Sequence, residues 1–298
     1  MRYSHRMSTD GRWNPGIAPA IGAYLAWGLF PLYWRLLERV SPLEIVAHRV
    51  IWSFVLVALL VTWRRRWAQL LSALKNRRVL VAMLVSTSLI TSNWLLFIWA
   101  VNSEHVTQAS LGYYVNPLVN VILARIFLGE RLRPLQLGAV ALATVGVINL
   151  SLQEGGFPWV ALTLAVSFGL YGLVRKVAPV ESLEALTVET GLAAPAALAF
   201  VARLGLDGAP SFGGDAADTV FLVGAGVTTA LPLLWFASGA RKLRYTTMGI
   251  LQYIAPTGQL ACAVLVFGEK FTSAHAVTFA LIWTAVILYA GDGLRAAA

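Results

Sequence analysis

Residues 43–63 read LEIVAHRVIWSFVLVALLVTW and are followed at once by Arg64, Arg65 and Arg66. An apolar stretch of about 20 residues is long enough to cross the hydrocarbon core of a bilayer as a helix. Arginines at the end of such a stretch favour the cytoplasmic side of the membrane. This segment is therefore predicted to be a transmembrane helix that ends in the cytoplasm.

The rest of the chain has the same character. Of its 298 residues, 58% are hydrophobic and 12% are charged, whereas a soluble domain carries about 25% charged residues. The connections between apolar stretches are short, which leaves no room for a separate soluble domain. The predicted fold class is an all-α membrane protein with ten transmembrane helices, at Ile17–Leu37, Leu43–Trp63, Val79–Val101, Val106–Leu128, Pro134–Leu152, Phe157–Val174, Leu183–Ala202, Ala217–Ala240, Tyr245–Gly268 and Ser273–Ala290.

The N-terminal segment and the single cysteine exclude two other kinds of protein. The polar, basic segment Met1–Gly16 resembles the start of a signal peptide, but no clear small-residue cleavage site follows and nine more apolar segments do. The first stretch is therefore expected to be retained as a transmembrane helix. The single cysteine, Cys262, lies within an apolar stretch, which argues against a disulfide framework or a cysteine-rich metal site.

The distribution of Lys and Arg predicts the orientation. With the N-terminus in the cytoplasm, 18 of the 23 cationic residues fall on the cytoplasmic side and four on the other, while Arg49 lies within a predicted helix. Arg2, Arg6, Arg12 and Arg295 are part of the cytoplasmic set. This asymmetry follows the positive-inside rule and predicts that both termini are cytoplasmic. The formal charge of +9 then reflects contact with anionic lipid headgroups, so nucleic-acid binding is not expected.

The chain also contains an internal repeat. Tyr114-x-x-Pro117 and Gly129-Glu130-Arg131 recur 139 positions later as Tyr253-x-x-Pro256 and Gly268-Glu269-Lys270. At nearly the same shift, three further matches connect the two halves of the chain: Thr107 with Thr246, Phe30–Tyr33 with Phe168–Tyr171, and Leu43-Glu44 with Leu183-Glu184.

The repeat predicts two domains of five helices each, at residues 17–152 and 157–290. Because five is an odd number, the second copy enters the membrane from the opposite side, which makes the repeat inverted. Inverted repeats are typical of secondary transporters, in which the solute site lies between the halves near the bilayer midplane. A structural membrane protein with a duplicated fold is the alternative.

Three segments carry a resemblance to a known family. They are residues 93–102 (NWLLFIWAVN), 109–118 (ASLGYYVNPL) and 127–131 (FLGER). They closely resemble the RarD-type branch of the drug/metabolite transporter superfamily, which is built from two EamA units. The resemblance covers nearly the whole chain and implies a ten-helix carrier of the bacterial inner membrane, with a central cavity and with the fifth and tenth helices at the periphery. Relatives with this fold export amino acids and related metabolites, and the branch name comes from a chloramphenicol phenotype.

Two ionisable residues lie early in the second predicted helix. An ionisable side chain within a membrane span is costly and is a candidate for function. His48 could bind a substrate carboxylate or titrate near neutral pH; alternatively it pairs with Glu44, one turn earlier, at the helix end. Arg49 points about 100° away from His48. It is expected to pair with a carboxylate or carbonyl group, or to extend toward the headgroups.

Amides and aromatic rings within the helices complete the candidate cavity. Asparagine amides can recognise the ammonium and carboxylate groups of an amino acid, or can instead join helices by hydrogen bonds. Buried Trp and Tyr offer an apolar surface with an N–H or O–H donor. The residues expected to line the cavity are Trp27, His48, Asn93, Trp94, Tyr113, Asn116, Tyr171, Trp235 and Tyr253.

Prolines within the predicted helices are candidate hinges. Pro31, Pro117, Pro232 and Pro256 each remove a backbone hydrogen bond and favour a bend. Pro117 and Pro256 are equivalent in the repeat, and bends at equivalent places suit a gating motion. Fixed kinks that serve only packing are the alternative.

The function expected from these features is export of amino acids or related small metabolites by alternating access. Apolar drugs such as chloramphenicol are the alternative cargo, and a non-transporting membrane interaction protein is the alternative class. No Asp or Glu lies near the centre of a predicted helix, so facilitated transport or exchange is favoured over proton coupling. No cofactor, metal site or enzymatic activity is expected, and the protein is predicted to act in the bilayer as a monomer or homodimer.

Overall fold

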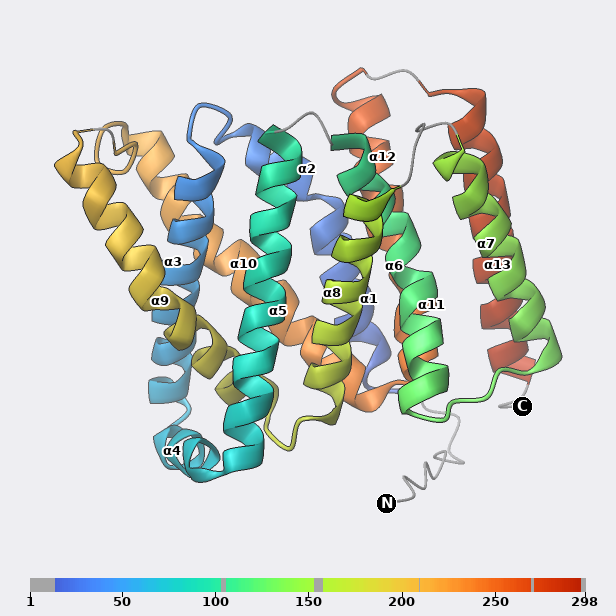
Figure 1. Ribbon diagram of the computed structural model, residues 1–298, viewed down its shortest axis with the longest axis horizontal. Coiled ribbons are helices and arrows are strands. Elements are labelled where there is room, and N and C mark those ends of the chain that lie inside the picture. The colour runs from blue at the N-terminus through green and yellow to red at the C-terminus, as the bar shows by residue number, and fades with distance from the viewer. Residues whose placement is uncertain (1–13, 103–105, 153–157, 209, 269–270, 296–298) are drawn as a thin grey trace.

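The computed structural model describes residues 14–102, 106–152, 158–208, 210–268 and 271–295 (Figure 1). Within these ranges all regular elements are α-helices. They are α1 (Ile17–Gly28), α2 (Phe30–Arg35), α3 (Pro42–Trp63), α4 (Trp67–Lys75), α5 (Arg77–Asn102), α6 (Val106–Phe127), α7 (Pro134–Ser151), α8 (Trp159–Val177), α9 (Ser182–Leu206), α10 (Ala216–Lys242), α11 (Tyr245–Leu251), α12 (Ile254–Leu265) and α13 (Ser273–Arg295).

Some of the residues used in the charge count and the repeat lie outside these ranges. They are Arg2, Arg6, Arg12, Glu269 and Lys270, and the side chains of Thr107 and Arg295 are likewise outside the described set.

Nine segments of the described chain are long and apolar enough to cross a membrane, and α1–α2 and α11–α12 each form one of them. The 22-residue helix α6 is not among the nine. Its polar residues include Asn116 and Asn120, which are buried inside the protein. The nine segments coincide with nine of the ten predicted helices, and the assignment of α6 as the tenth stays a prediction.

The helices start where the local sequence favours a start. Ser41 accepts a hydrogen bond from the backbone N–H of Glu44 and is followed by Pro42 in the first turn of α3. Asp215 accepts one from Asp218 at the start of α10. Such caps satisfy backbone donors that the helix leaves free, and proline is tolerated in the first turn because it lacks the N–H.

The two halves run in opposite directions. In Figure 1, α1, α5 and α7 run upward while their counterparts α8, α10 and α13 run downward. Likewise α3 and α6 run downward, whereas α9 and α11–α12 run upward. Helix α1 begins and α13 ends at the lower edge, at the same level as the connections α3–α5, α6–α7, α8–α9 and α10–α11. We call this edge, which carries most of the Lys and Arg, the cationic end.

Two equivalent glutamates reflect this inversion. Glu44, at the start of α3, accepts hydrogen bonds from the backbone N–H groups of Ser211 and Phe212, in the segment after α9. Glu184, at the start of α9, forms an ion pair of 2.7 Å with Arg66, in the segment after α3. Each of these two antiparallel helices therefore binds the connection that follows the other.

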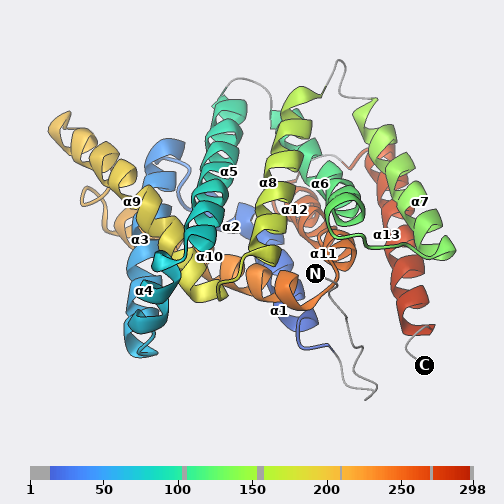
Figure 2. The same ribbon diagram turned by 60° about the horizontal axis from the view of Figure 1, so that its bottom comes forward.

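Helices α7 and α13 pack against each other at one edge of the protein, as both views show (Figures 1 and 2). Asn149 of α7 donates a hydrogen bond to Thr278 of α13, and Arg133 forms an ion pair of 2.7 Å with Asp292. This is the peripheral position that the family resemblance implies for the fifth and tenth helices.

The halves differ in shape at two pairs of equivalent spans. The first and ninth spans are interrupted, between α1 and α2 and between α11 and α12, whereas their counterparts α8 and α6 are continuous. Helices α1 and α12 meet where a Cβ atom on Gly28 would lie 3.1 Å from the Cα atom of Gly258. Gln259 of α12 donates to the carbonyl of Trp27. Side-chain donors of this kind satisfy carbonyl groups that an interrupted helix leaves free in a membrane.

Candidate solute-binding cavity

A cavity of about 270 Å³ lies between the two halves of the protein. Most of its wall is apolar, and a small set of amides, hydroxyls and one guanidinium provides the polar groups. The residues around it come from α1, α2, α3, α5, α6, α8, α10 and α12, with Gln252 between α11 and α12. They are Trp27, Phe30, Pro31, Trp34, Arg49, Ile90, Asn93, Trp94, Phe97, Ala109, Ser110, Gly112, Tyr113, Asn116, Leu164, Phe168, Thr229, Leu233, Gln252, Ala255, Pro256 and Gln259.

The guanidinium in this wall belongs to Arg49 of α3. Its Nε donates a hydrogen bond of 2.9 Å to Oγ1 of Thr229 on α10. Its Cζ lies 4.9 Å from the ring centroid of Trp34 and 5.0 Å from that of Trp94. A cation over an indole ring is attracted by the negative face of the ring. The prediction that Arg49 pairs with a carboxylate or carbonyl is wrong for the described residues, since its neighbours there are the Thr229 hydroxyl, two indole rings and the phenol of Tyr113.

Four amide side chains border the cavity, those of Asn93, Asn116, Gln252 and Gln259, and each also joins helices. Asn93 of α5 donates to the carbonyl of Leu164 and to Ser167 on α8. Asn116 of α6 donates to the carbonyl of Ala165 on α8. Gln252 accepts a hydrogen bond of 2.8 Å from Asn120, which lies between the two halves.

In Asn93, Gln252 and Gln259 these bonds use one end of the amide, whereas Asn116 uses both, because its oxygen accepts a hydrogen bond from Asn120. No partner occurs for the Asn93 oxygen among the described residues. The amides of the cavity therefore serve the helix contacts predicted as the alternative and still present polar atoms to a solute.

An aromatic floor closes the cavity toward the cationic end. It consists of Tyr24, Tyr171, Phe236 and Tyr245, all fully buried. The rings of Tyr171 and Phe236 stack with centroids 6.3 Å apart, and Phe236 also contacts the cavity residue Trp27 at 5.5 Å.

Hydrogen bonds hold this floor in place. The Tyr24 hydroxyl donates to the carbonyl of Met248, and the Tyr245 hydroxyl donates to the carbonyl of Gly169 at 2.6 Å. The second bond requires a glycine nearby, because a Cβ atom on Gly172 would collide with the Tyr245 hydroxyl.

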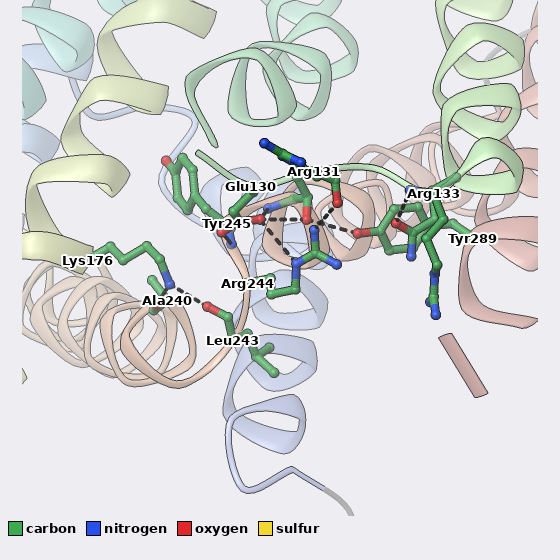
Figure 3. A network of polar contacts seen from close by, with 11 residues as sticks. Glu130, Arg131, Arg133, Lys176, Ala240, Leu243, Arg244, Tyr245 and Tyr289 are labelled. Carbon is green, nitrogen blue, oxygen red and sulfur yellow. Dashed lines mark hydrogen bonds and ion pairs between the residues drawn. The ribbon is translucent and has the colours of Figure 1, made fainter. Parts of the chain in front are cut away.

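A polar network lies at the cationic end beyond the floor (Figure 3). The carboxylate of Glu130, between α6 and α7, accepts hydrogen bonds from the backbone N–H groups of Tyr245 (2.7 Å) and Thr246 (3.1 Å) and from the Thr246 hydroxyl. Arg244 lies 3.5 Å from the same carboxylate, and Tyr289 of α13 donates to Thr246. We call these five residues the Glu130 network. It joins the first half of the chain to the start of α11 in the second half.

Five of the nine residues predicted to line the cavity do so: Trp27, Asn93, Trp94, Tyr113 and Asn116. The other four do not surround it. Tyr171 belongs to the aromatic floor, Tyr253 is buried in the cluster formed with α7 and α13, and Trp235 is 41% exposed beside Gly22.

His48 is the fourth of these residues, and it lies at the start of α3. Its ring stacks on Phe212 at 4.7 Å, and its Nδ1 accepts a hydrogen bond from Trp52. Glu44, the partner named in the alternative interpretation, binds the same Ser211–Phe212 segment. The structure therefore places His48 among the contacts of this helix end, outside the cavity wall.

The four predicted hinge prolines occupy different surroundings. Pro31 and Pro256 line the cavity, each close to a helix interruption. Pro117 lies inside the continuous helix α6 and packs against Gly249 of α11, where a Cβ atom would lie 2.8 Å from the Pro117 carbonyl oxygen. Pro232 is buried within α10. Two of the four thus lie where α1–α2 and α11–α12 change direction.

Sequence reasoning missed two polar arrangements. The first is the pair of amides Gln252 and Gln259 in the cavity wall, which could have been identified as polar residues within the ninth predicted helix. The second arrangement is a buried ion pair of 3.3 Å between Arg175 of α8 and Glu189 of α9. Glu189 also accepts hydrogen bonds from Ser86 and Tyr171. Glu189 is 14 positions from Arg175, so no helical spacing linked them in the sequence.

Comparisons with known proteins agree with this architecture. The profile of the EamA-like transporter family matches residues 14–152 and 158–291, and the chain belongs to this family. It is a multi-pass membrane transporter. An uncharacterized transporter from Vibrio cholerae is 47% identical over 94% of this chain and 93% of its own length. Protein RarD from Escherichia coli is 41% identical over 94% and 95%.

The fold is also present in a solved structure. A crystal structure described only as that of a protein superposes with a TM-score of 0.73 and covers 94% of this chain and 98% of its own. At 19% sequence identity this likeness concerns the fold alone. The family membership confirms the predicted resemblance and the two EamA repeats.

Proposed function

We propose that this protein exports amino acids or related small metabolites across the bacterial inner membrane by alternating access. The observation that carries the proposal is the cavity between the halves, whose mostly apolar wall contains the Arg49 guanidinium and several amides. An apolar pocket with a few placed polar groups suits a small organic solute. Its position between two inverted repeats is the one expected in secondary transporters.

The orientation follows from the charges. We assign the cationic end to the cytoplasm, with both termini and residues 64–66 on that side, and count α6 as the tenth transmembrane helix. The aromatic floor and the Glu130 network then separate the cavity from the cytoplasm. The conformation would be one that does not release solute to the inside.

Alternation between two states is supported by the difference between the repeats, 17–152 and 157–290. Helices α1–α2 and α11–α12 are interrupted, while their counterparts α8 and α6 are continuous. In an inverted repeat, exchange of these shapes between the halves would open the other end of the cavity. Pro31 and Pro256 lie at the interrupted helices and would serve as hinges.

Reconstitution of the purified protein in liposomes tests the proposal. Labelled amino acids and chloramphenicol are offered to these vesicles and to protein-free vesicles of the same lipid. Faster movement of amino acids in the protein-containing vesicles supports the proposal. The aromatic wall favours a second candidate, export of apolar drugs, and movement of chloramphenicol alone would support that function instead. If no solute moves faster than in protein-free vesicles, the proposal is wrong.

The same vesicles test the coupling mechanism. The cavity wall contains no Asp or Glu among the described residues, which supports facilitated transport or exchange. A pH gradient imposed on amino-acid-loaded vesicles is then expected to cause no accumulation against the concentration gradient. Clear accumulation would show proton coupling.

A further inference from the structure

We propose that Arg49 is the receptor for a carboxylate on the transported solute, and that the carboxylate is the obligatory recognition group whereas an amine is dispensable. The proposal deepens the function proposed above and rests on it. It begins with the charge balance of the cavity. Arg49 is the one permanently charged residue among the described residues of the wall. Its charge is therefore not neutralised by a neighbour in this wall.

Carboxylates elsewhere in the same region already have partners. Glu44, one turn before His48 on the same helix, binds Ser211 and Phe212. Glu189 is paired with Arg175. Neither is available to Arg49 without breaking contacts that hold other helices together. A cation held at membrane depth without a protein anion is costly unless a ligand or water completes its surroundings.

Among the described residues, no hydrogen bond uses the terminal N–H groups of Arg49. The guanidinium carries five N–H donors, and Thr229 uses the one on Nε. The indole rings of Trp34 and Trp94 stabilise the charge through their faces and consume no hydrogen-bond donor. They also restrict where the planar group can turn. The two terminal nitrogens therefore remain for a ligand, in the fork geometry that matches a carboxylate.

The size and charge of the cavity narrow the class of ligand. A single guanidinium balances one negative charge, which suits a monocarboxylate better than a phosphate carrying nearly two. The rings around Arg49 suit an apolar or aromatic body attached to the carboxylate. An ammonium group would meet only uncharged partners, such as the oxygen of Asn93 and the faces of aromatic rings, and it would be repelled by Arg49. The wall thus supplies a charge partner for the acid and none for the amine.

A ligand series on the wild-type protein tests this without any variant. Four compounds share one phenyl body: phenylalanine, 3-phenylpropanoate, phenylalaninamide and phenethylamine. Binding to the purified full-length protein in detergent is measured by quenching of tryptophan fluorescence and by thermal shift. The two acids are expected to bind, and the amide and the amine are expected to bind at least about tenfold more weakly, as loss of a charge-assisted hydrogen bond predicts. The proposal would be overturned if phenylalanine and its amide bound equally well. It would also be overturned if phenylalanine or 3-phenylpropanoate failed to bind.

Variants of Arg49 test whether this residue causes the preference for acids. Arg49→Gln is expected to weaken binding of both acids by about tenfold or more, and Arg49→Lys to weaken it less, because lysine keeps the charge but lacks the fork. Arg203→Gln is the matched control, since Arg203 is 82% exposed, pairs with Asp207 and is not part of the cavity wall. Unchanged acid binding in a folded Arg49→Gln protein would refute the role of Arg49. If Arg49→Gln fails to fold, acid binding by Arg49→Lys and the ligand series on the wild-type protein still test the proposal.

The readouts separate this proposal from the function itself. Acid-selective binding without solute movement in liposomes would contradict transport and leave the carboxylate receptor standing. Movement of amino acids together with equal binding of acids and amides would support transport and contradict the carboxylate receptor.

Discussion

Arg49 lies in α3 of the first half and Arg175 lies in the last turn of α8 in the second half, and the surroundings of these two arginines are opposite. Arg175 lies 3.3 Å from the carboxylate of Glu189, and both side chains are almost completely buried. Arg49 borders the central cavity and contacts Thr229 and two indole rings. The same residue type is thus neutralised by the protein in one place and left for a partner in the other.

The different surroundings of the two arginines predict a role in folding for Arg175 and a role in solute binding for Arg49. Removing one member of a buried ion pair leaves an uncompensated charge and is strongly destabilising. Arg175 and Glu189 should therefore matter for folding. Arg49 has no protein anion to lose among its described contacts, so the loss of its charge should appear in solute binding. The following changes are expected to break or sharpen this contrast, from the largest effect to the smallest.

Glu189→Ala is expected to have the largest effect. It leaves Arg175 buried without a carboxylate and removes the acceptor for Ser86 and Tyr171. The expected destabilisation is about 3–5 kcal/mol. Thermal unfolding in detergent measures it. The double change Arg175→Met with Glu189→Met should recover much of the loss, and a double variant less stable than Glu189→Ala would contradict the assignment.

Arg49→Gln is expected to reduce solute transport by about tenfold or more while the thermal stability stays close to wild type. The missing charge corresponds to about 1.5–3 kcal/mol of binding free energy, as for hydrogen bonds to charged groups. Initial transport rates in liposomes and unfolding curves are compared for the same preparations. A fall in stability as large as that of Glu189→Ala would remove the contrast between the two arginines.

Glu130→Gln tests a carboxylate of intermediate burial, with a side chain 11% exposed. The amide keeps one acceptor oxygen, so it can accept from Tyr245 or from Thr246 but not from both, because its NH2 group is a donor. The attraction to Arg244 is lost as well, and a partly exposed ion pair of this kind contributes about 1 kcal/mol. The unfolding midpoint should fall, but less than for Glu189→Ala. An unchanged midpoint would mean that the Glu130 network does not stabilise the fold.

Thr229→Val removes the hydrogen bond that fixes Nε of Arg49 and keeps nearly the same side-chain shape. The expected loss of solute affinity corresponds to about 0.5–1.5 kcal/mol. Equilibrium binding to the purified variant measures it, with Arg203→Gln as the control. A loss as great as that of Arg49→Gln would indicate that Thr229 itself contacts the solute.

His48→Ala is expected to have the smallest effect on transport, within about twofold. Its ring is buried against Phe212 and Trp52 at the start of α3 and does not lie in the cavity wall, so the change removes no group that faces the solute. Transport in liposomes is measured beside an unfolding curve. A folded His48→Ala protein with strongly reduced transport would restore His48 as a site candidate.

The sequence by itself determined the membrane fold, the repeat and most of the helix positions. These depend on local composition: hydropathy marks segments such as 43–63, the arginines that follow predict orientation, and a nearly constant shift relates Glu130 to Glu269. Five of the nine predicted cavity residues also came from this reasoning, because polar groups within membrane helices are costly and aromatic rings with an N–H or O–H donor suit a solute pocket.

The tertiary structure alone decided which way each helix turns its residues. Tyr171, Trp235 and Tyr253 are as aromatic as Trp94, but helix rotation places them in the floor, on the surface or near α7 and α13. The partners of the two arginines were equally beyond the sequence, since Glu189 reaches Arg175 from another helix and no described carboxylate reaches Arg49. Hydropathy depends on composition along the chain, whereas a binding site depends on contacts between helices far apart in it.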